Sequence, residues 1–447
     1  MIIGLRREDL NKKGEKRAAL VPETVAALIQ AGHRVLVQPA VHPVTGEVKR
    51  TFPDAEYAAA GAEITESLRD ARVLFGLKEI DLADLQPDTA YLFFSHTHKG
   101  QLKNRPMLRR LQDLRCTLID YELIVNQRNQ RLLTAFTYFA GYAGITDSLW
   151  TLGRRLLLAG IPNPFSVIPQ AIRHEDLDLV RTAFHRAAEQ IETEGTPASL
   201  PPVVITLLGN GKTSSGAQEL LDLLPLQTIR PDELETVYYH GSRKRVYKLV
   251  LEIPQMFRLK AEYAHQAEGL EPAGISRLYI QSPERFESNL ESIFPYTTVL
   301  VNCILWSPRF PRLLTRQDTA EWYRTHRTLQ VIGDISCDPE GAIQFSRETW
   351  IDDPVYIYDP ELQSTAQGME GTGIAVMAVT NLPCEFSADA SEAFARELQP
   401  MLASLANADL DAPDAAAAGL PEPLRKATIL WQGQFTPDYA YMQAFTA

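Results

Sequence analysis

The segment VVITLLGNGKTSSG at residues 203–216 constrains the fold of this chain most strongly. Its apolar first half predicts a buried strand, its glycines predict a tight turn, and the apolar spacing that follows predicts a helix over residues 215–224. In such a unit, glycines let the backbone approach a pyrophosphate, and the amides at the helix start face its negative charge. The segment therefore predicts a dinucleotide-binding loop made of Gly209, Gly211, Lys212, Thr213, Ser214, Ser215 and Gly216.

The glycine spacing leaves one alternative open and excludes another. Ser214 stands where the common G-x-G-x-x-G pattern has its third glycine, so a turn that binds no ligand stays possible. An ATP-binding Walker A loop needs a glycine where this chain has Thr206, before Gly211 and Lys212. The segment thus favours a dinucleotide over ATP.

The choice between the two nicotinamide dinucleotides depends on the end of the next strand, about 20 residues further on, which meets the adenine ribose. The sequence there is Thr228-Ile229-Arg230. A guanidinium pairs with a 2′-phosphate, whereas a carboxylate repels it. Arg230 therefore favours NADP(H), while the nearby Asp232 and Glu233 leave NAD(H) open.

Short apolar runs alternate with helical patterns along most of the chain. We expect strands at residues 35–37, 73–75, 91–94, 117–119, 203–208, 226–229, 298–306 and 329–335. Helices are expected at 24–31 (with Pro22 in the first turn), 105–114, 139–160 and 388–405, and another helical run is expected after 373. A polar stretch lies near 186–202, and we expect residues 407–421 to form an exposed connector. The alternation predicts an α/β fold with parallel sheets covered by helices, and 447 residues predict two domains.

Composition excludes several classes of partner. The net charge is −12, which disfavours nucleic acid and anionic membrane surfaces. No apolar stretch is long enough to span a bilayer, and charge from Arg6 onward leaves no room for a signal peptide, so we expect a cytoplasmic protein. The four cysteines lie far apart, so reduced thiols are expected rather than disulfides or metal ligands.

Polar residues end three of the expected strands in the first 135 residues, and side chains at the carboxyl ends of parallel strands converge on one crevice. We expect these groups to form a site, although each alone also fits a structural or solvated role. His96-x-His98 has no further residue at metal-ligand spacing, so no metal is expected. The candidate groups, together with an arginine before the first helix, are Arg17, Lys78, Glu79, His96 and Glu122.

The chain resembles two groups of proteins in the segments KRAALVP, GLKE, FFSHTHK, LIDYE, GNGKTSSGAQ, GDISCDPEGAIQF and EGTGIAVMAVTNLP. One is the lysine–ketoglutarate reductase half of the bifunctional aminoadipate-semialdehyde synthase. The other is the stand-alone, lysine-forming saccharopine dehydrogenases. Both are similar in fold to alanine dehydrogenase and transhydrogenase. The resemblance implies two Rossmann-type domains flanking a cleft: a substrate domain of residues 1–140 and 375–447, and a dinucleotide-binding domain of residues 141–374.

The same resemblance implies roles for individual residues. Lys78 and His96 match the acid/base pair, Arg17 a substrate-carboxylate ligand, and Asp334 and Asp338 the nicotinamide side. The residues around the amino-acid substrate are Glu79, Glu122 and Arg131. Glu79 follows the stand-alone type, whereas the loop GNGKTSSG follows the reductase half. The second, saccharopine-cleaving half has no counterpart here.

The implied reaction is the reductive condensation of L-lysine with 2-oxoglutarate to saccharopine, or its reverse. A neutral ε-amine attacks the keto carbon, water leaves, and hydride reduces the imine. Histidine and a desolvated lysine have suitable pKa values for the proton transfers, and their individual roles stay open. Alternatives are a related amino-acid dehydrogenase of the alanine dehydrogenase or opine type and a non-catalytic NADP(H) sensor. The expected assembly is a monomer or homodimer.

Overall fold

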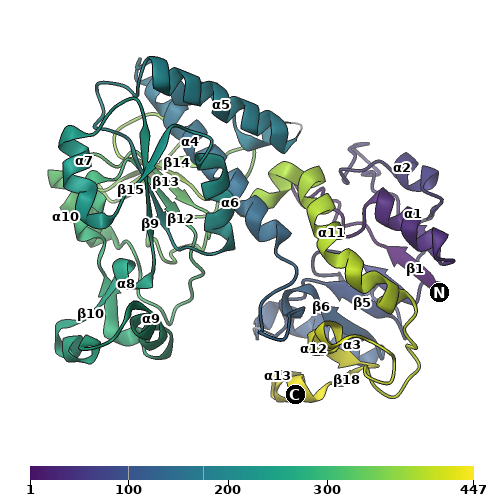
Figure 1. The fold of residues 1–447 in the computed structure, drawn as a ribbon. Helices are drawn as coiled ribbons and strands as arrows, with labels where there is room; N and C mark the ends of the chain where they lie inside the picture. The colour runs from purple at the N-terminus through teal and green to yellow at the C-terminus, as the bar shows by residue number, and fades with distance from the viewer. Residues whose placement is uncertain (99, 175, 447) are drawn as a thin grey trace. The chain divides into compact units, whose positions relative to one another are not determined.

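The computed structural model describes residues 1–98, 100–174 and 176–446, which form two compact units (Figure 1). The first unit comprises Met1–Phe136 and Ser387–Ala447, and the second comprises Thr137–Phe386. The chain returns to the first unit after residue 386 rather than after 374. The reason is that Ile374–Met377, in the run expected to be helical, forms strand β16 inside the sheet of the second unit.

The first unit contains an eight-stranded sheet in the order β18-β17-β6-β5-β4-β1-β2-β3. Strands β1 to β6 run parallel, and β17 adds antiparallel to β6. Its strands are β1 (Ile2–Leu5), β2 (Arg34–Val37), β3 (Glu63–Ile64), β4 (Val73–Phe75), β5 (Ala90–Phe93), β6 (Thr117–Asp120), β17 (Thr428–Trp431) and β18 (Gln434–Phe435). The expected parallel sheet is thus confirmed for this unit.

Helices cover both faces of this sheet because successive residues of its strands point to opposite sides. Val73 and Phe75 pack in one apolar cluster, while Leu74 lies in the other. The helices are α1 (Pro22–Gln30), α2 (Asp54–Ala59), α3 (Arg105–Asp113), α11 (Ser387–Ala406), α12 (Glu422–Ala427) and α13 (Gln443–Thr446). Pro22 begins α1, as expected.

The stretch expected to be an exposed connector, residues 407–421, belongs partly to the core. Its alanines at 408, 412, 415 and 418 are buried against the same cluster as α1 and α11. The sequence is rich in alanine, aspartate and proline, and the small methyl groups of its alanines fill gaps in the packing. The expectation of exposure was therefore wrong for these side chains.

The second unit contains another eight-stranded sheet, in the order β15-β14-β16-β13-β12-β7-β9-β8. Its strands are β7 (Val204–Leu208), β8 (Leu226–Thr228), β9 (Val246–Leu251), β12 (Val299–Asn302), β13 (Val331–Asp334), β14 (Val355–Asp359), β15 (Ser364–Gln367) and β16. A separate hairpin joins β10 (Phe257–Leu259) and β11 (Phe286–Ser288). The unexpected strand β9 lies between β7 and β8.

The helices of the second unit are α4 (Ala135–Leu158, which begins at the unit boundary), α5 (Leu177–Thr193), α6 (Lys212–Leu221), α7 (Leu234–His240), α8 (Ile253–Met256), α9 (Pro272–Gln281) and α10 (Arg316–Thr325). Helix α6 begins at Lys212 rather than at 215, directly after the glycine turn. Helix α5 extends into the stretch near residues 186–202, which the sequence marked only as polar. No helix among the described residues is long and apolar enough to cross a membrane.

Helices α4 and α6 approach so closely that both contact points are glycines. A Cβ on Gly216 would lie 2.3 Å from the Tyr138 carbonyl oxygen, and one on Gly141 would lie 2.0 Å from the Thr213 carbonyl oxygen. Real Cβ atoms cannot approach backbone oxygen so closely. The last glycine of the turn motif therefore serves helix packing.

Candidate functional site

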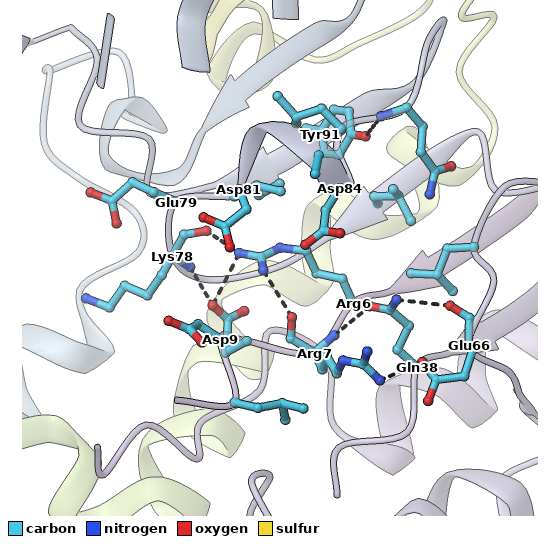
Figure 2. A pocket seen from close by; sticks show the side chains of 18 of the residues that line it. Arg6, Arg7, Asp9, Gln38, Glu66, Lys78, Glu79, Asp81, Asp84 and Tyr91 are labelled. Atoms are coloured by element: carbon cyan, nitrogen blue, oxygen red, sulfur yellow. Dashed lines mark hydrogen bonds and ion pairs between the residues drawn. The ribbon is translucent and has the colours of Figure 1, made fainter. Parts of the chain in front are cut away.

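The sheet of the first unit has a switch point between β1 and β4, where the strand order reverses direction. Ligands of such sheets bind outside the carboxyl ends of the strands at this point. A cavity of about 1230 Å³ lies there, lined among others by Arg6 after β1, Gln38 after β2 and Lys78 after β4 (Figure 2). The sequence-predicted residues Lys78 and Glu79 are part of its wall.

Two charged residues after β1 hold the backbone of the Lys78 segment. The Glu8 carboxylate accepts hydrogen bonds from the backbone N–H groups of Leu77, at 2.7 Å, and Lys78, at 3.0 Å. The Arg6 guanidinium donates to the Lys78 carbonyl oxygen and pairs with Glu8 at 3.2 Å. A Cβ at Gly76 would lie 2.2 Å from Arg6 Nε, so this glycine makes room for the guanidinium.

The sequence interpretation missed Arg6 and Glu8. Their signal was present, because a run of four charged residues (6–9) directly follows the apolar strand at residues 2–5. Such residues in an α/β sheet point toward the same crevice as the other strand ends.

His96 and Glu79 form a pair at the ends of neighbouring strands β5 and β4. His96 Nδ1 lies 2.8 Å from Glu79 Oε1, and each side chain is 27% exposed. Burial acts to raise the pKa of Glu79, but hydrogen bonds from His96 and the backbone, with the charges of His96 and Lys103, outweigh it and lower the pKa to about 2. His96 has φ of 51°, a left-handed conformation that its neighbours must stabilise.

Asp120 connects the turn that carries His96 with the turn that carries Glu122. This fully buried carboxylate accepts hydrogen bonds from Ser95, both from its backbone N–H at 3.1 Å and from its hydroxyl at 2.5 Å. Its second oxygen accepts the backbone N–H of Glu122 at 2.8 Å. Two of the predicted site residues are therefore placed by one residue that the sequence interpretation did not select.

Glu122 lies beside Arg131 and His98. Arg131 Nη2 lies 2.6 Å from Glu122 Oε1, and His98 Nε2 lies 3.7 Å from Glu122 Oε2. The Glu122 side chain is 9% exposed, whereas that of Arg131 is half exposed. The structure thus brings Glu122 and Arg131 together, as a pair with each other.

Arg17 is buried and paired inside the unit. Its Nε and Nη2 donate to the Glu15 carboxylate at 2.9 and 2.7 Å, and its side chain is 4% exposed. The guanidinium also stacks over the Phe136 ring, 4.4 Å from its centre. An Arg17 that binds a substrate carboxylate must therefore exchange Glu15 for that substrate.

The glycine turn of the second unit has the backbone that its sequence indicates. Gly209 follows β7 with φ of 97°, a conformation that favours glycine, and Gly211 caps α6 with no atom within 4 Å of where its Cβ would lie. This open space fits a pyrophosphate, because the backbone N–H groups at the start of α6 have no side-chain cap and can bind an anion. Ser214 and Gly216 are buried, Gly216 against Tyr138 of α4, whereas Gly211 and Lys212 are exposed.

Arg230 does not lie where the NADP(H) prediction requires. It follows β8 at the edge of the sheet, because β9 occupies the place beside β7. The guanidinium contacts Asp232 at 3.1 Å and Glu233 at 3.6 Å. The residue after β9 is Glu252, whose Oε1 accepts a hydrogen bond of 3.2 Å from Asn210 Nδ2 in the glycine turn.

Asp334 is the last residue of β13, and Asp338 follows that strand. Asp334 is buried and accepts hydrogen bonds from Asn302 Nδ2, at 2.8 Å, and from the Ser346 hydroxyl. Burial raises the pKa of Asp334 to about 6, against the lowering effect of these hydrogen bonds, and burial also raises the pKa of the half-buried Asp338. The four cysteines are free thiols, as expected.

Comparison with known sequences gives related proteins over the whole chain. Residues 4–143 match the family of the alanine dehydrogenase/PNT N-terminal domain. The chain is 34% identical to α-aminoadipic semialdehyde synthase of Arabidopsis thaliana, over 99% of this chain and 41% of that protein. Identity to the mitochondrial protein of that name from Bos taurus is 32%, over 99% of this chain and 47% of the relative. The chain therefore spans less than half the length of these relatives.

A second group of relatives has a similar length. The chain is 26% identical to saccharopine dehydrogenase [NAD(+), L-lysine-forming] of Neurospora crassa, over 90% of this chain and 91% of that protein.

Among solved structures, the fold is similar to an L-alanine dehydrogenase, with a TM-score of 0.63 at 20% identity over the full length of both chains. It is also similar to a transhydrogenase from Sinorhizobium meliloti, with a TM-score of 0.59 at 16% identity, over 98% of this chain and 100% of that one. The α/β architecture with two mostly parallel sheets is thus that of the alanine dehydrogenase fold. The chain is similar over nearly its whole length to proteins named α-aminoadipic semialdehyde synthase and saccharopine dehydrogenase [NAD(+), L-lysine-forming], and its N-terminal region matches the alanine dehydrogenase/PNT N-terminal domain.

Proposed function

We propose that this protein is a nicotinamide-dependent oxidoreductase that condenses L-lysine with 2-oxoglutarate to saccharopine, or runs the reverse reaction. The observation that carries the proposal is the Glu79–His96 pair after β4 and β5, with Lys78 and Glu79 in the wall of the cavity at the switch point of the first unit. It is supported by whole-chain similarity to proteins named for saccharopine and aminoadipic semialdehyde metabolism.

Lys78 and His96 are the proposed acid/base pair. Condensation needs a base to take a proton from the lysine ε-ammonium and an acid to protonate the oxygen that leaves as water. A carboxylate at Glu79 orients the His96 ring, and Glu8 with Arg6 fixes the backbone that carries Lys78. When bound, the nicotinamide supplies or accepts the hydride.

The remaining polar groups are proposed to bind the substrates. Glu79 and Glu122 are suited to a cationic ammonium, and Arg131 and Arg17 to carboxylates. Arg131 is half exposed and reaches a ligand by exchanging Glu122, whereas Arg17 must leave the buried pair with Glu15. Asp334 and Asp338 are proposed to line the nicotinamide side.

The proposed cofactor site is the glycine turn between β7 and α6. Gly209, Gly211, Lys212, Thr213 and Ser215 are at the exposed or half-exposed part of this turn. The buried Ser214 and Gly216 support it from behind. The sequence favoured NADP(H) because of Arg230, with NAD(H) as the alternative. Arg230 follows β8, and β9 separates that strand from β7.

A spectrophotometric assay at 340 nm tests the proposal. Purified protein is mixed with lysine and 2-oxoglutarate, with NADH and NADPH in separate reactions, and then with saccharopine and the oxidised cofactors. Turnover of the lysine pair that exceeds turnover of ammonia with pyruvate supports it. Faster reaction with ammonia and pyruvate indicates the alternative amino-acid dehydrogenase activity. Cofactor binding without turnover of any pair indicates a non-catalytic sensor.

A further inference from the structure

We propose that Glu252 gives the second unit a preference for NAD(H), which has a free 2′-hydroxyl on its adenine ribose, over NADP(H). This proposal deepens the proposed function, on which it rests for turnover, by assigning the form of the cofactor. It replaces Arg230 with Glu252 as the residue that meets the ribose.

The strand order places Glu252 beside the glycine turn. Strand β9 pairs directly with β7, and their last residues are in register, Leu208 with Leu251. The backbone N–H of Gly209 then donates to the Leu251 carbonyl oxygen at 2.8 Å. Glu252 is therefore level with the start of the turn, which is where an acid that binds the ribose hydroxyls stands in dinucleotide-binding sheets.

A capping box at the start of α8 holds the Glu252 backbone, its carboxylate also accepts the Gln255 backbone N–H there, and the residue is exposed. Its backbone N–H donates to Gln255 Oε1 at 2.7 Å in the capping arrangement that begins α8. The carboxylate accepts from Asn210 Nδ2 at 3.2 Å, so it already faces the loop that would carry the pyrophosphate. A ribose diol offers two donors to such a carboxylate.

Basic residues near Glu252 in the sequence face other carboxylates. Lys248, earlier on β9, is buried with its Nζ 2.5 Å from Asp222. Arg258, after α8, pairs with Glu287 at 2.9 Å and also with Glu291. A 2′-phosphate at Glu252 would therefore place about two negative charges beside a carboxylate, which repels it.

Arg230 is displaced from this position by one strand. Strand β8 pairs with β9, and its last residue, Thr228, is in register with Lys248. The β8 strand thus ends before β9 reaches Leu251. The exposed Arg230 side chain forms ion pairs with Asp232 and Glu233.

The experiment measures dissociation constants for NADH and NADPH by fluorescence titration of the purified protein, without lysine or 2-oxoglutarate. We expect NADH to bind about tenfold more tightly or better, because a charge-assisted hydrogen bond replaces a repulsive contact. Glu252→Gln keeps the side-chain length and removes the charge, and should reduce the NADH:NADPH affinity ratio by about tenfold. Glu235→Gln, which removes an exposed acid of α7 in the same unit, is the matched control and should leave the ratio within about twofold.

Arg230→Gln decides between the two assignments. If Arg230 meets a 2′-phosphate, this variant weakens NADPH binding selectively, which overturns the proposal. Tighter binding of NADPH than NADH by the unaltered protein, an unchanged ratio in Glu252→Gln, or no binding of either dinucleotide also overturns it. A preference for NADH without turnover of lysine and 2-oxoglutarate leaves this inference standing and rejects the proposed reaction. Turnover of lysine and 2-oxoglutarate with a preference for NADPH supports the proposed reaction and rejects this inference.

Discussion

His96 Nδ1 lies 2.8 Å from Glu79 Oε1, at the ends of two adjacent parallel strands. The pKa of Glu79 is lowered to about 2, so its carboxylate is ionised at neutral pH and can only accept hydrogen bonds. Nδ1 must therefore carry the hydrogen, which leaves Nε2 to exchange protons with a substrate.

Replacing the two proposed acid/base groups should impair chemistry more than folding. We expect Lys78→Met and His96→Gln each to lower kcat by about 100-fold or more, the usual effect of a lost acid or base. Steady-state kinetics with saturating lysine and 2-oxoglutarate measures this, with circular dichroism to verify the fold. If both variants turn over at the unaltered rate, the assignment is wrong.

Glu79→Gln should change the pH dependence of stability. A carboxyl group with a lowered folded-state pKa stabilises the fold above its ordinary value of 4.5, and this stabilisation is lost as pH falls toward about 2. The difference in unfolding free energy between the unaltered protein and Glu79→Gln should therefore be larger at pH 6 than at pH 3. Urea unfolding at both pH values measures it, and an equal difference at both would contradict the assigned ion pair.

The two glycines of the turn motif should respond differently to substitution. Gly216→Ala places a methyl group against the Tyr138 carbonyl oxygen and should destabilise the unit by about 1–3 kcal/mol. Gly211→Ala meets open space, so stability should hold while dinucleotide affinity falls about tenfold or more as the pyrophosphate is kept away. Thermal unfolding and NADH titration distinguish the two effects. Equal loss of stability in both variants would show that Gly211 has a packing role.

Local patterns were sufficient to predict many elements. Strand β4 matches its predicted bounds of 73–75, and Pro22 begins α1. Strand β9 was missed because Lys248 interrupts its apolar run, although Asp222 neutralises that lysine in the fold. Strand β16 was taken for a helix because a short, uniformly apolar run has no period that separates the two.

For the site, too, the sequence predicted local features correctly and failed where the position of a residue depends on strand order. Lys78, Glu79 and His96 lie at strand ends as predicted, since strand ends are visible in a sequence. The Arg230 interpretation assumed that strands adjacent in the sequence are adjacent in space. The insertion of β9 between β7 and β8 depends on long-range pairing, which no local pattern encodes.

Asp147 and Glu385 form a buried acid pair in the second unit. Their carboxylates accept the backbone N–H groups of Ala171 and Ile172, at 2.8 and 2.9 Å. Burial raises the pKa of both groups, so the folded state binds protons more tightly than the unfolded state. Unfolding free energy should therefore fall as pH rises above the ordinary carboxyl range. Melting temperatures from pH 5 to pH 8 should fall less in Asp147→Asn than in the unaltered protein, and a parallel decline would contradict this account.

The buried Arg17–Glu15 pair should show strong coupling. Arg17→Met removes the guanidinium that pairs with the buried Glu15 and should cost about 3–5 kcal/mol of stability. The double variant Glu15→Gln with Arg17→Met should recover part of that loss, because no buried charge is then left behind. Urea unfolding of the single and double variants measures the coupling. If the double variant is less stable than Arg17→Met, the pair does not behave as an isolated ion pair.

Because β17 adds to β6 and α11 packs against α1, the first unit requires residues 387–447, which are translated after the whole second unit. The second unit is one continuous segment of chain, so on the ribosome it can fold before β17 is available to pair with the strands of residues 1–136. Until then the backbone edge of β6 stays open to other chains. A nascent or truncated polypeptide that stops before residue 428 is therefore the form most prone to aggregation, and the one most dependent on chaperones.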